Sequence, residues 1–305
     1  MTDDTALAGT RTRIAAHLVG RRRELELALA AVSAGRDLVL EGPPGTSKTT
    51  MLKAITAEWG IPLLFVEGNA DLTPGKLVGH HNPARVLRED YSADNFVAGP
   101  LVEAMRQGGF LYIEEFNRAP EDTLNTLLTA MADRAVEVPR VGRIEALPTF
   151  RVIASMNPYD NVGTTRLSTS VSDRLNRIVI GYQDAEAERG IVALRTGLLG
   201  AAAERLIPDA VAVTRATREH PDVRQGSSVR GAIDCALVAH ELFALRGLVD
   251  DVTEDAYRDT FFDAMLVSLS GRIHVDEAAE TTPERVLREI WEDHFILEPA
   301  RAEPG

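Results

Sequence analysis

Residues 38–50 read Leu38-Val39-Leu40-Glu41-Gly42-Pro43-Pro44-Gly45-Thr46-Ser47-Lys48-Thr49-Thr50. A short apolar strand runs into a Gly/Pro-rich loop, and a helical pattern follows the Lys-Thr pair, which is the layout of a phosphate-binding P-loop. Backbone N–H groups of the loop and of the following helix would converge on anionic oxygens. Lys48 would reach the β- and γ-phosphates, and the hydroxyl of Thr49 would ligate Mg²⁺. Residues 42–50 therefore predict a binding site for a nucleoside phosphate.

Ser47 stands where the P-loop pattern G-x-x-x-x-G-K-[ST] has its second glycine. Only glycine takes a positive φ at little cost, so we expect a negative φ at this serine. Without a phosphate, the segment would be an ordinary strand, a turn stiffened by Pro43 and Pro44, and a helix. The assignment therefore depends on what the rest of the chain supplies.

The chain has 305 residues, which suits one large domain or a core with a smaller companion. Its single cysteine, Cys235, excludes an internal disulfide and lies in an apolar helical run, which favours packing over a nucleophilic role. The acidic N-terminus lacks an apolar signal segment, and no run reaches the ~18 apolar residues of a membrane span. These features predict a cytoplasmic protein.

The net charge of −13 argues against a general nucleic-acid-binding surface, which needs clustered Lys and Arg. Lysine occurs only at positions 48, 53 and 76, so the Asn/Thr-Lys-x-Asp motif with which GTPases read guanine is absent. The seven histidines show no metal-ligand spacing with the cysteine. We expect the pair His80-His81 to lie in a solvated loop.

Strands and helices alternate over the first two-thirds of the chain, which predicts an α/β fold with a parallel five-stranded sheet between helices. The strand candidates are 38–40, 63–66, 110–113, 152–155 and 178–180, and the helical patterns include 25–32, 50–58, 101–106 and 121–133. Ligands of such sheets bind at the carboxyl ends of strands, where the P-loop, Glu114-Glu115 and Asn157 all fall.

After Tyr182 the sequence reads as Ala/Leu/Arg/Glu-rich helices without further strands. We predict an α/β nucleotide-binding core over 1–182 and an all-helical domain over 183–305, with a loose tail at 298–305. Thr282-Pro283-Glu284 marks one helix start, because an N-cap residue precedes a proline at the first helical position. Residues 71–100 interrupt the core, and a stretch this long without clear periodicity is usually functional or mobile.

Two further strand ends carry polar groups suited to phosphate-ester hydrolysis, which needs a held metal, an activated water and neutralised charge. The strand 110–113 ends in two carboxylates, as in a Walker B motif. Glu114 would act on Mg²⁺ through a metal-bound water, and Glu115 would orient and deprotonate the attacking water. Asn157 follows the strand 152–155, and its amide could bind the γ-phosphate or the water. The ordinary alternatives are solvated acids and an Asn-Pro turn.

Three segments together resemble AAA+ ATPases of the MoxR type: Gly42–Thr49, Glu114-Glu115-Phe116-Asn117-Arg118-Ala119-Pro120 and Met156-Asn157-Pro158. The run Glu-x-Asn-Arg-Ala-Pro is the most specific of them, and Leu124–Met131 is similar to the family's Leu-Leu-x-Ala-Met helix. The resemblance covers residues 15–275 and implies a P-loop AAA+ core with a C-terminal helical lid. Ser47 and Glu114 depart from the commonest pattern of this family.

The resemblance implies further roles. Arg174 of Asp173-Arg174 would be an arginine finger inserted into a neighbouring subunit, with Arg166 and Arg177 as alternatives; the ordinary alternative is a surface ion pair worth under ~1 kcal/mol. Arg230 would be sensor 2 and Asn157 sensor 1, and Val19-Gly20 would border the adenine. Residues 71–100 would be the helix-2 insert and 136–149 a hairpin, both facing a ring pore.

The function that the resemblance implies is a ring-forming, hexameric ATPase that uses ATP and Mg²⁺ to remodel or activate a client protein. A separate protein with a von Willebrand factor A domain is the implied partner, and the wording of Glu41–Lys48 is similar to a subgroup linked to carbon monoxide dehydrogenase maturation. Alternatives are a GTPase or nucleotide kinase, a nucleotide-gated scaffold with little hydrolysis, and a DNA translocase. Ser47 and Glu114 keep the scaffold open.

Overall fold

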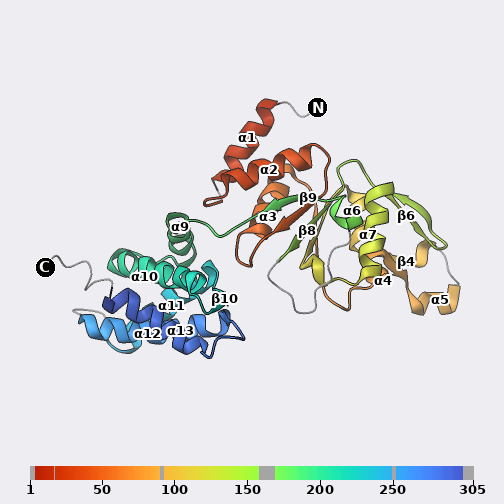
Figure 1. Cartoon of the computed structure of the whole chain (residues 1–305). Coiled ribbons are helices and arrows are strands. Elements are labelled where there is room, and N and C mark those ends of the chain that lie inside the picture. The colour runs from red at the N-terminus through yellow and green to blue at the C-terminus, as the bar shows by residue number, and fades with distance from the viewer. Residues whose placement is uncertain (1–3, 17, 90–92, 158–168, 249–251, 298–305) are drawn as a thin grey trace. The chain divides into compact units, whose positions relative to one another are not determined.

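The computed structural model describes residues 4–16, 18–89, 93–157, 169–248 and 252–297 (Figure 1). The chain divides into two compact units, Met1–Gly181 and Tyr182–Gly305. Among the described helices, none is both long enough and apolar enough to span a bilayer.

A five-stranded parallel sheet forms the centre of the first unit, in the order β2-β5-β8-β1-β9. The strands are β1 (Leu38–Glu41), β2 (Leu63–Glu67), β5 (Phe110–Glu114), β8 (Arg151–Met156) and β9 (Asn176–Val179). All five predicted strands are confirmed. The inner strands β1, β5 and β8 are almost wholly buried, as expected of a parallel sheet that is covered on both faces.

Helices cover both faces because successive residues of each strand point to opposite sides. Leu38 and Leu40 pack with α1 (Asp4–Ala15), α2 (Arg22–Ser33) and α3 (Lys48–Trp59). Val39 belongs to the opposite face, with α4 (Pro74–Val78), α6 (Pro100–Gln107) and α7 (Glu121–Asp133). Each fully buried Leu or Ile of these clusters contributes about 1.5–3 kcal/mol. The four predicted helical patterns lie within α2, α3, α6 and α7 and are confirmed.

The irregular segment 71–100 is built from short elements: α4, β3 (Gly79–His81), α5 (Pro83–Glu89), η1 (Ala93–Asn95) and β4 (Phe96–Ala98). Strands β3 and β4 pair antiparallel, so the prediction of a solvated loop at His80-His81 was wrong. His81 Nε2 lies 3.1 Å from the carbonyl of Pro139, and its ring packs edge-on against Phe96. The predicted hairpin at 136–149 is confirmed as β6 (Ala135–Val138) and β7 (Gly142–Glu145).

The second unit packs α9 (Ala185–Thr196), α10 (Gly200–Glu219), α11 (Val229–Leu245), α12 (Glu254–Leu269) and α13 (Pro283–Glu292) around one apolar core. The expectation of no strands here was wrong, because β10 (Val223–Gln225) pairs antiparallel with β11 (His274–Val275). Thr282 caps α13 by accepting a hydrogen bond from the Arg285 N–H, which confirms that helix start. Cys235 is buried in this core, and burial raises the pKa of its thiol to about 12, which confirms a packing role.

The ends of β1 and β9 approach each other closely at Gly42. Ile180 N–H donates to the Glu41 carbonyl at 2.7 Å, and Gly42 N–H donates to the Met156 carbonyl at 3.0 Å. A Cβ on Gly42 would lie 2.0 Å from the carbonyl oxygen of Ile180. A glycine is therefore required at the start of the P-loop by the packing of the sheet as well as by any ligand.

We expect Gly42→Ala to lower the free energy of unfolding by about 3 kcal/mol, the upper end for overpacking, because the obstructing atom belongs to a hydrogen-bonded backbone. Gly75→Ala is the control, since its Cβ would meet only Thr73 Oγ1 at 3.9 Å within α4. Alanine there should be neutral or stabilising by up to about 1 kcal/mol. Urea unfolding measures both, and a Gly42→Ala midpoint equal to wild type would contradict the close approach.

Candidate nucleotide site

Lys48 lies at the centre of the P-loop. Its side chain is buried, and Nζ donates to the carbonyls of Gly42 at 2.9 Å and Pro43 at 2.7 Å. Thr46 Oγ1 also donates to the Pro43 carbonyl at 2.9 Å. These contacts curl the loop around the ammonium group, so the loop is already closed around the charge that a phosphate would meet. At the rim of the loop, Pro44 and Thr50 are exposed.

The prediction of a negative φ at Ser47 was wrong. Ser47 has φ +66° and ψ +18°, in the left-handed region, as does Gly45 with φ +74°. An L-residue pays roughly 1–2 kcal/mol for this conformation. The loop thus keeps the backbone geometry that the second glycine of the P-loop pattern supplies.

The side chains of Thr49 and Glu114 meet, as the sequence predicted for a metal site. Thr49 Oγ1 donates to Glu114 Oε1 at 3.1 Å and lies 3.1 Å from Tyr112 Oη. Hydroxyl and carboxylate oxygens are the ligands that Mg²⁺ prefers, so this pair fits that ion. Thr49 follows β1 through the P-loop and Glu114 is the last residue of β5, and these parallel strands end at the same edge of the sheet.

Tyr112 is a site residue that sequence reasoning missed. It lies two residues before Glu114 on the same face of β5, is fully buried, and donates from Oη to Ser155 Oγ at 2.9 Å. Burial raises the pKa of this phenol above its ordinary value, so it stays protonated as a donor. The sequence did carry a signal, because residues two apart on a strand share a face and Tyr112 lies two residues before Glu114. A tyrosine within an apolar strand, however, is ordinarily interpreted as a core residue.

Glu115 turns the chain sharply after β5. It has φ +52° and ψ +42°, and it leads into the 3₁₀ turn η2 (Phe116–Arg118). Its carboxylate pairs with Arg118 Nε at 3.2 Å, both side chains being about two-fifths exposed. A Cβ on Gly68 would lie 2.4 Å from the Glu115 carbonyl oxygen, so β2 crosses this turn closely. Non-glycine residues held at positive φ cluster at functional sites.

Asn157 and Val19-Gly20 lie at the same edge of the sheet as the P-loop. Asn157 is half-buried and directly follows β8, which pairs with both β1 and β5. Arg21, next to Gly20, is buried and donates to the Gly181 carbonyl at 2.6 Å. That carbonyl follows Ile180, which packs against Gly42, so Val19-Gly20 is held beside the P-loop entrance.

The three candidate arginine fingers differ in their surroundings. Arg174 is exposed and precedes β9 at the amino edge of the sheet, where Nη1 donates to the Ser170 carbonyl at 3.1 Å. Arg177 binds Glu41 through two hydrogen bonds, Nε–Oε2 at 2.5 Å and Nη2–Oε1 at 2.7 Å, which raise its pKa. Arg166 lies outside the described residues. Arg177 is therefore engaged with its own β1, and Arg174 is not brought to its own P-loop.

Arg230 lies in the second unit, where it is exposed in the first turn of α11. Its N–H donates to Ser228 Oγ, the N-cap of that helix, at 3.3 Å. The role of sensor 2 stays a prediction.

Residues 37–175 match the AAA domain of the dynein-related subfamily. The gas vesicle ATPase GvpN of Ancylobacter aquaticus is 30% identical over an alignment of 270 residues that covers 83% of this chain and 72% of that protein. The chain is an AAA+ ATPase. GvpN2 of Halobacterium salinarum is 28% identical to the ATPase over an alignment of 269 residues that covers 83% of this chain and 74% of that protein. The predicted fold class and ATP hydrolase activity are thereby confirmed.

Solved structures agree with this fold. NtrX of Brucella abortus in complex with ADP superposes with a TM-score of 0.53 at 22% identity, over 89% of the ATPase and 60% of that chain. RuvB of Thermotoga maritima, a Holliday junction branch migration motor, superposes with a TM-score of 0.51 at 19% identity, over 81% and 72%. At these identities the likeness concerns the fold alone.

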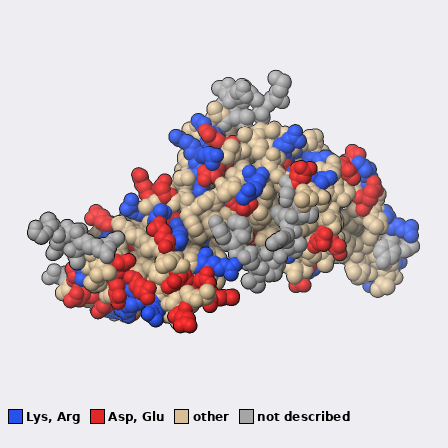
Figure 2. Space-filling view, in the orientation of Figure 1, with Lys and Arg blue, Asp and Glu red and all other residues tan. Residues whose placement is uncertain are grey.

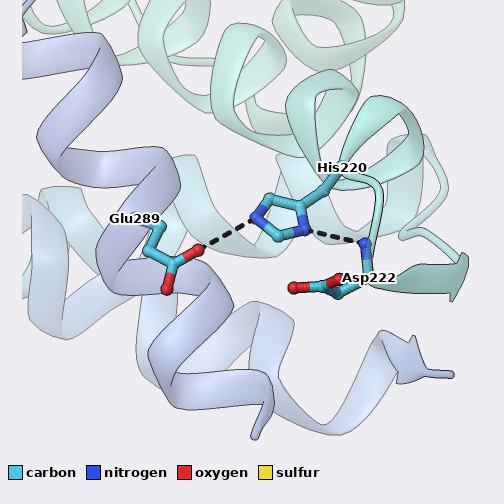
Figure 3. A group of neighbouring side chains, drawn as sticks. All are labelled: His220, Asp222 and Glu289. Atoms are coloured by element: carbon cyan, nitrogen blue, oxygen red, sulfur yellow. Dashed lines mark hydrogen bonds and ion pairs between the residues drawn. The ribbon is translucent and has the colours of Figure 1, made fainter. Parts of the chain in front are cut away.

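A second polar cluster of the ATPase, in its second unit, joins His220, Asp222 and Glu289 (Figure 3). Asp222 N–H donates to His220 Nδ1 at 3.3 Å, so these hydrogen bonds assign the ring proton to Nε2, which lies 3.3 Å from Glu289 Oε2. A metal at Nε2 would displace that proton while Nδ1 stays an acceptor, the reverse of ordinary histidine ligation. The cluster is therefore better explained as a set of hydrogen bonds that joins the end of α10 to α13 than as a metal centre.

The conformation of Ser47 predicts how substitutions there affect stability. Ser47→Gly removes roughly 1–2 kcal/mol of backbone strain and costs roughly 0.5–1 kcal/mol through the greater entropy of the unfolded chain, so a net gain of up to about 1.5 kcal/mol is expected. Ser47→Val should lose stability, since a β-branched residue tolerates positive φ worst. Denaturant midpoints of both variants are the measurement. If Ser47→Gly unfolds at a lower denaturant concentration than the wild type, the serine hydroxyl stabilises the loop by more than the backbone strain costs.

Proposed function

We propose that this ATPase assembles into a homo-oligomeric ring, a hexamer, and uses ATP and Mg²⁺ to remodel or activate a client protein. The observation that carries the proposal is the position of Arg174 on the edge of the sheet opposite the P-loop. Strand β9 runs parallel to β1 from Asn176, and the four residues of β1 alone span about 13 Å. An arginine there can serve a phosphate only in the site of another copy.

The charges on the two edges of the sheet support a head-to-tail contact between copies. Arg174 lines a pocket of about 610 Å³ together with Arg36, Arg134 and Arg151, and two acids, Asp37 and Asp173, accompany them. At the carboxyl edge, β2 and β5 end in Glu67 and Glu114, while Glu41 at the end of β1 is paired with Arg177. A basic edge complements an acidic edge, and repeated head-to-tail contacts close into a ring when the rotation allows.

Within one site, the residues of this chain would share the work of hydrolysis. Glu115 accepts a proton from water as its oxygen attacks the γ-phosphorus and the bond to the ADP oxygen breaks. Its ion pair with Arg118 is worth under ~1 kcal/mol at that exposure, so releasing the carboxylate costs little. Asn157 orients the water or the γ-phosphate, and Lys48 neutralises charge. Thr49 and Glu114 would hold Mg²⁺, which supplies charge stabilisation when bound.

The client is proposed from the relatives. Two of them are named gas vesicle ATPases, and they align over 83% of this chain, so we propose a client within a gas vesicle-type protein assembly. Maturation of carbon monoxide dehydrogenase is the second candidate, favoured by the wording of Glu41–Lys48. Either client would be presented with a separate partner carrying a von Willebrand factor A domain. A pull-down with the ATP-trapped Glu115→Gln protein would identify the client and this partner.

Two of the alternatives lose support. A DNA translocase would need basic surface, but the net charge is −13, and basic and acidic side chains are interspersed on the face drawn in Figure 2. A scaffold with little hydrolysis rested on Ser47 and Glu114. Ser47 keeps the glycine-type conformation, and Glu114 contacts Thr49, so neither departure from the family pattern favours the scaffold over a hydrolase.

Glu115→Gln should bind ATP and lose phosphate release by about 10²–10⁴-fold, because an amide cannot accept the proton of the attacking water. Phosphate release and retention of labelled ATP are measured on the same preparation. Glu121→Gln, an exposed acid in the first turn of α7, is the matched control and should hydrolyse normally. If Glu115→Gln hydrolyses ATP at the wild-type rate, Glu115 is not the catalytic base.

Arg174→Ala should keep ATP binding and lose turnover by about 10³–10⁵-fold, since an arginine finger neutralises transition-state charge. Mixing it with Glu115→Gln chains should restore part of the activity, because a site with an intact Glu115 then meets a neighbour with an intact Arg174. Steady-state ATPase across mixing ratios is the measurement. The absence of recovery at every ratio would contradict a site shared between copies.

A further inference from the structure

A buried carboxylate organises one end of the second unit. Glu188 of α9 has a side chain only 2% exposed. Its Oε1 accepts from Arg218 Nη1 at 2.7 Å, and its Oε2 accepts from Arg215 Nη1 at 3.3 Å, both arginines belonging to α10. A buried charge without partners is strongly unfavourable, so the three side chains fix one another. With two cations for one anion, the cluster keeps an excess positive charge that needs further acceptors.

Arg218 supplies further contacts. Its Nε donates to the carbonyl of Ser227 at 2.6 Å, and its guanidinium carbon lies 3.9 Å from the ring centroid of Tyr182. The guanidinium is therefore held by a carboxylate, a carbonyl and an aromatic face at once, which uses the rigid fork that distinguishes arginine from lysine. Its side chain is 10% exposed, so these contacts are shielded from water.

The Ser227 carbonyl belongs to the turn that begins α11. Ser227 N–H donates to Thr217 Oγ1 at 2.9 Å, and a Cβ on Gly226 would lie 2.6 Å from the Cα of Arg218. The turn therefore lies directly against the backbone of α10. Ser228 caps α11, and Arg230 follows in the first helical turn. The direction in which Arg230 leaves the helix is thus set by a turn that Arg218 holds.

The same cluster holds the segment where the second unit begins. Arg215 Nη1 donates to the carbonyl of Gln183 at 2.9 Å, and Tyr182 lies under Arg218. Tyr182 and Gln183 are the first two residues after Gly181, where the first unit ends. One buried ion cluster therefore binds both the linker between the units and the turn that carries Arg230.

We propose that Arg218 is a positioning residue for nucleotide turnover: it holds the Ser227 turn so that Arg230 is presented in one orientation, and it couples that turn to the linker through Tyr182. This inference rests on the predicted role of Arg230 as sensor 2, in which its guanidinium would contact the γ-phosphate, and on the proposed ATPase function. In this proposal Arg218 contacts neither the nucleotide nor the attacking water. It acts only through the position of Arg230.

The test is a double-mutant cycle of Arg218→Gln and Arg230→Ala, read as kcat and KM for ATP. Arg218→Gln should lower kcat by about 10–100-fold in the wild-type background, as misplacement of a reacting group does. In the Arg230→Ala background it should have no further effect, because its route of action is already gone. Equal losses in both backgrounds would overturn the positioning proposal and leave the ATPase function standing.

A matched control exists within the same helix. Arg205 of α10 also pairs with a carboxylate, Glu254 at 2.7 Å, and also lies over a tyrosine, Tyr257 at 3.5 Å. Arg205→Gln should leave kcat unchanged, and a loss equal to that of Arg218→Gln would show that any broken ion pair in α10 has the same effect. Arg218→Lys should keep the charge beside Glu188 and recover stability without recovering kcat. Full recovery of kcat by lysine would overturn the proposal.

A measurement that does not depend on ATP hydrolysis tests the positioning role of Arg218 separately from the predicted role of Arg230. Amide hydrogen exchange over 226–231 in nucleotide-free protein should rise in Arg218→Gln and stay at the wild-type rate in Arg205→Gln. Unchanged exchange in Arg218→Gln overturns the positioning role whether or not the ring hydrolyses ATP. Raised exchange together with wild-type kcat in Arg230→Ala would instead reject the assigned role of Arg230, and the positioning proposal with it.

Discussion

The parallel pairing of β1 with both β8 and β9 is the constraint on which the rest of the first unit depends. Because all five strands point the same way, groups that follow a strand gather at one edge, and groups that precede a strand gather at the other. By this rule Glu114 contacts Thr49, Asn157 lies at the same edge as the P-loop, and Arg174 lies at the opposite edge. The close approach of Gly42 to Ile180 locks the arrangement.

Backbone strain marks the same edge. Ser47 and Glu115 both have left-handed conformations, and each lies next to a residue expected to face the phosphates or the metal, Lys48 and Glu114. At roughly 1–2 kcal/mol apiece, these conformations are sustained by the buried strands that flank them. Glycine at position 47 would relieve this strain, whereas Gly68 packs closely against the turn at Glu115.

The sequence predicted the strands and helices that have a clear apolar pattern. It missed the features that depend on contacts between distant parts of the chain. All five sheet strands and the Thr49–Glu114 pair follow from apolar runs and strand polarity. The φ of Ser47 does not, because closure of the loop decides it against the preference of serine. Strands β10 and β11 have three and two residues, too few for a period of two to register. Tyr112 reads as core until its hydroxyl is seen beside Thr49.

The proposed division of the active site between copies would change what the ATPase can do alone. If Arg174 supplies about 10³–10⁵ in rate, a separate copy lacks about 4–7 kcal/mol of transition-state stabilisation and hydrolyses ATP only slowly. Turnover then depends on a correctly docked neighbour. The ion cluster around Glu188 would extend this dependence to the second unit, because Arg218 contacts both the Ser227 turn before Arg230 and the ring of Tyr182. Any displacement of Tyr182 must also disturb Arg218, so under this proposal hydrolysis would respond to the conformation of this segment as well as to the presence of a neighbour.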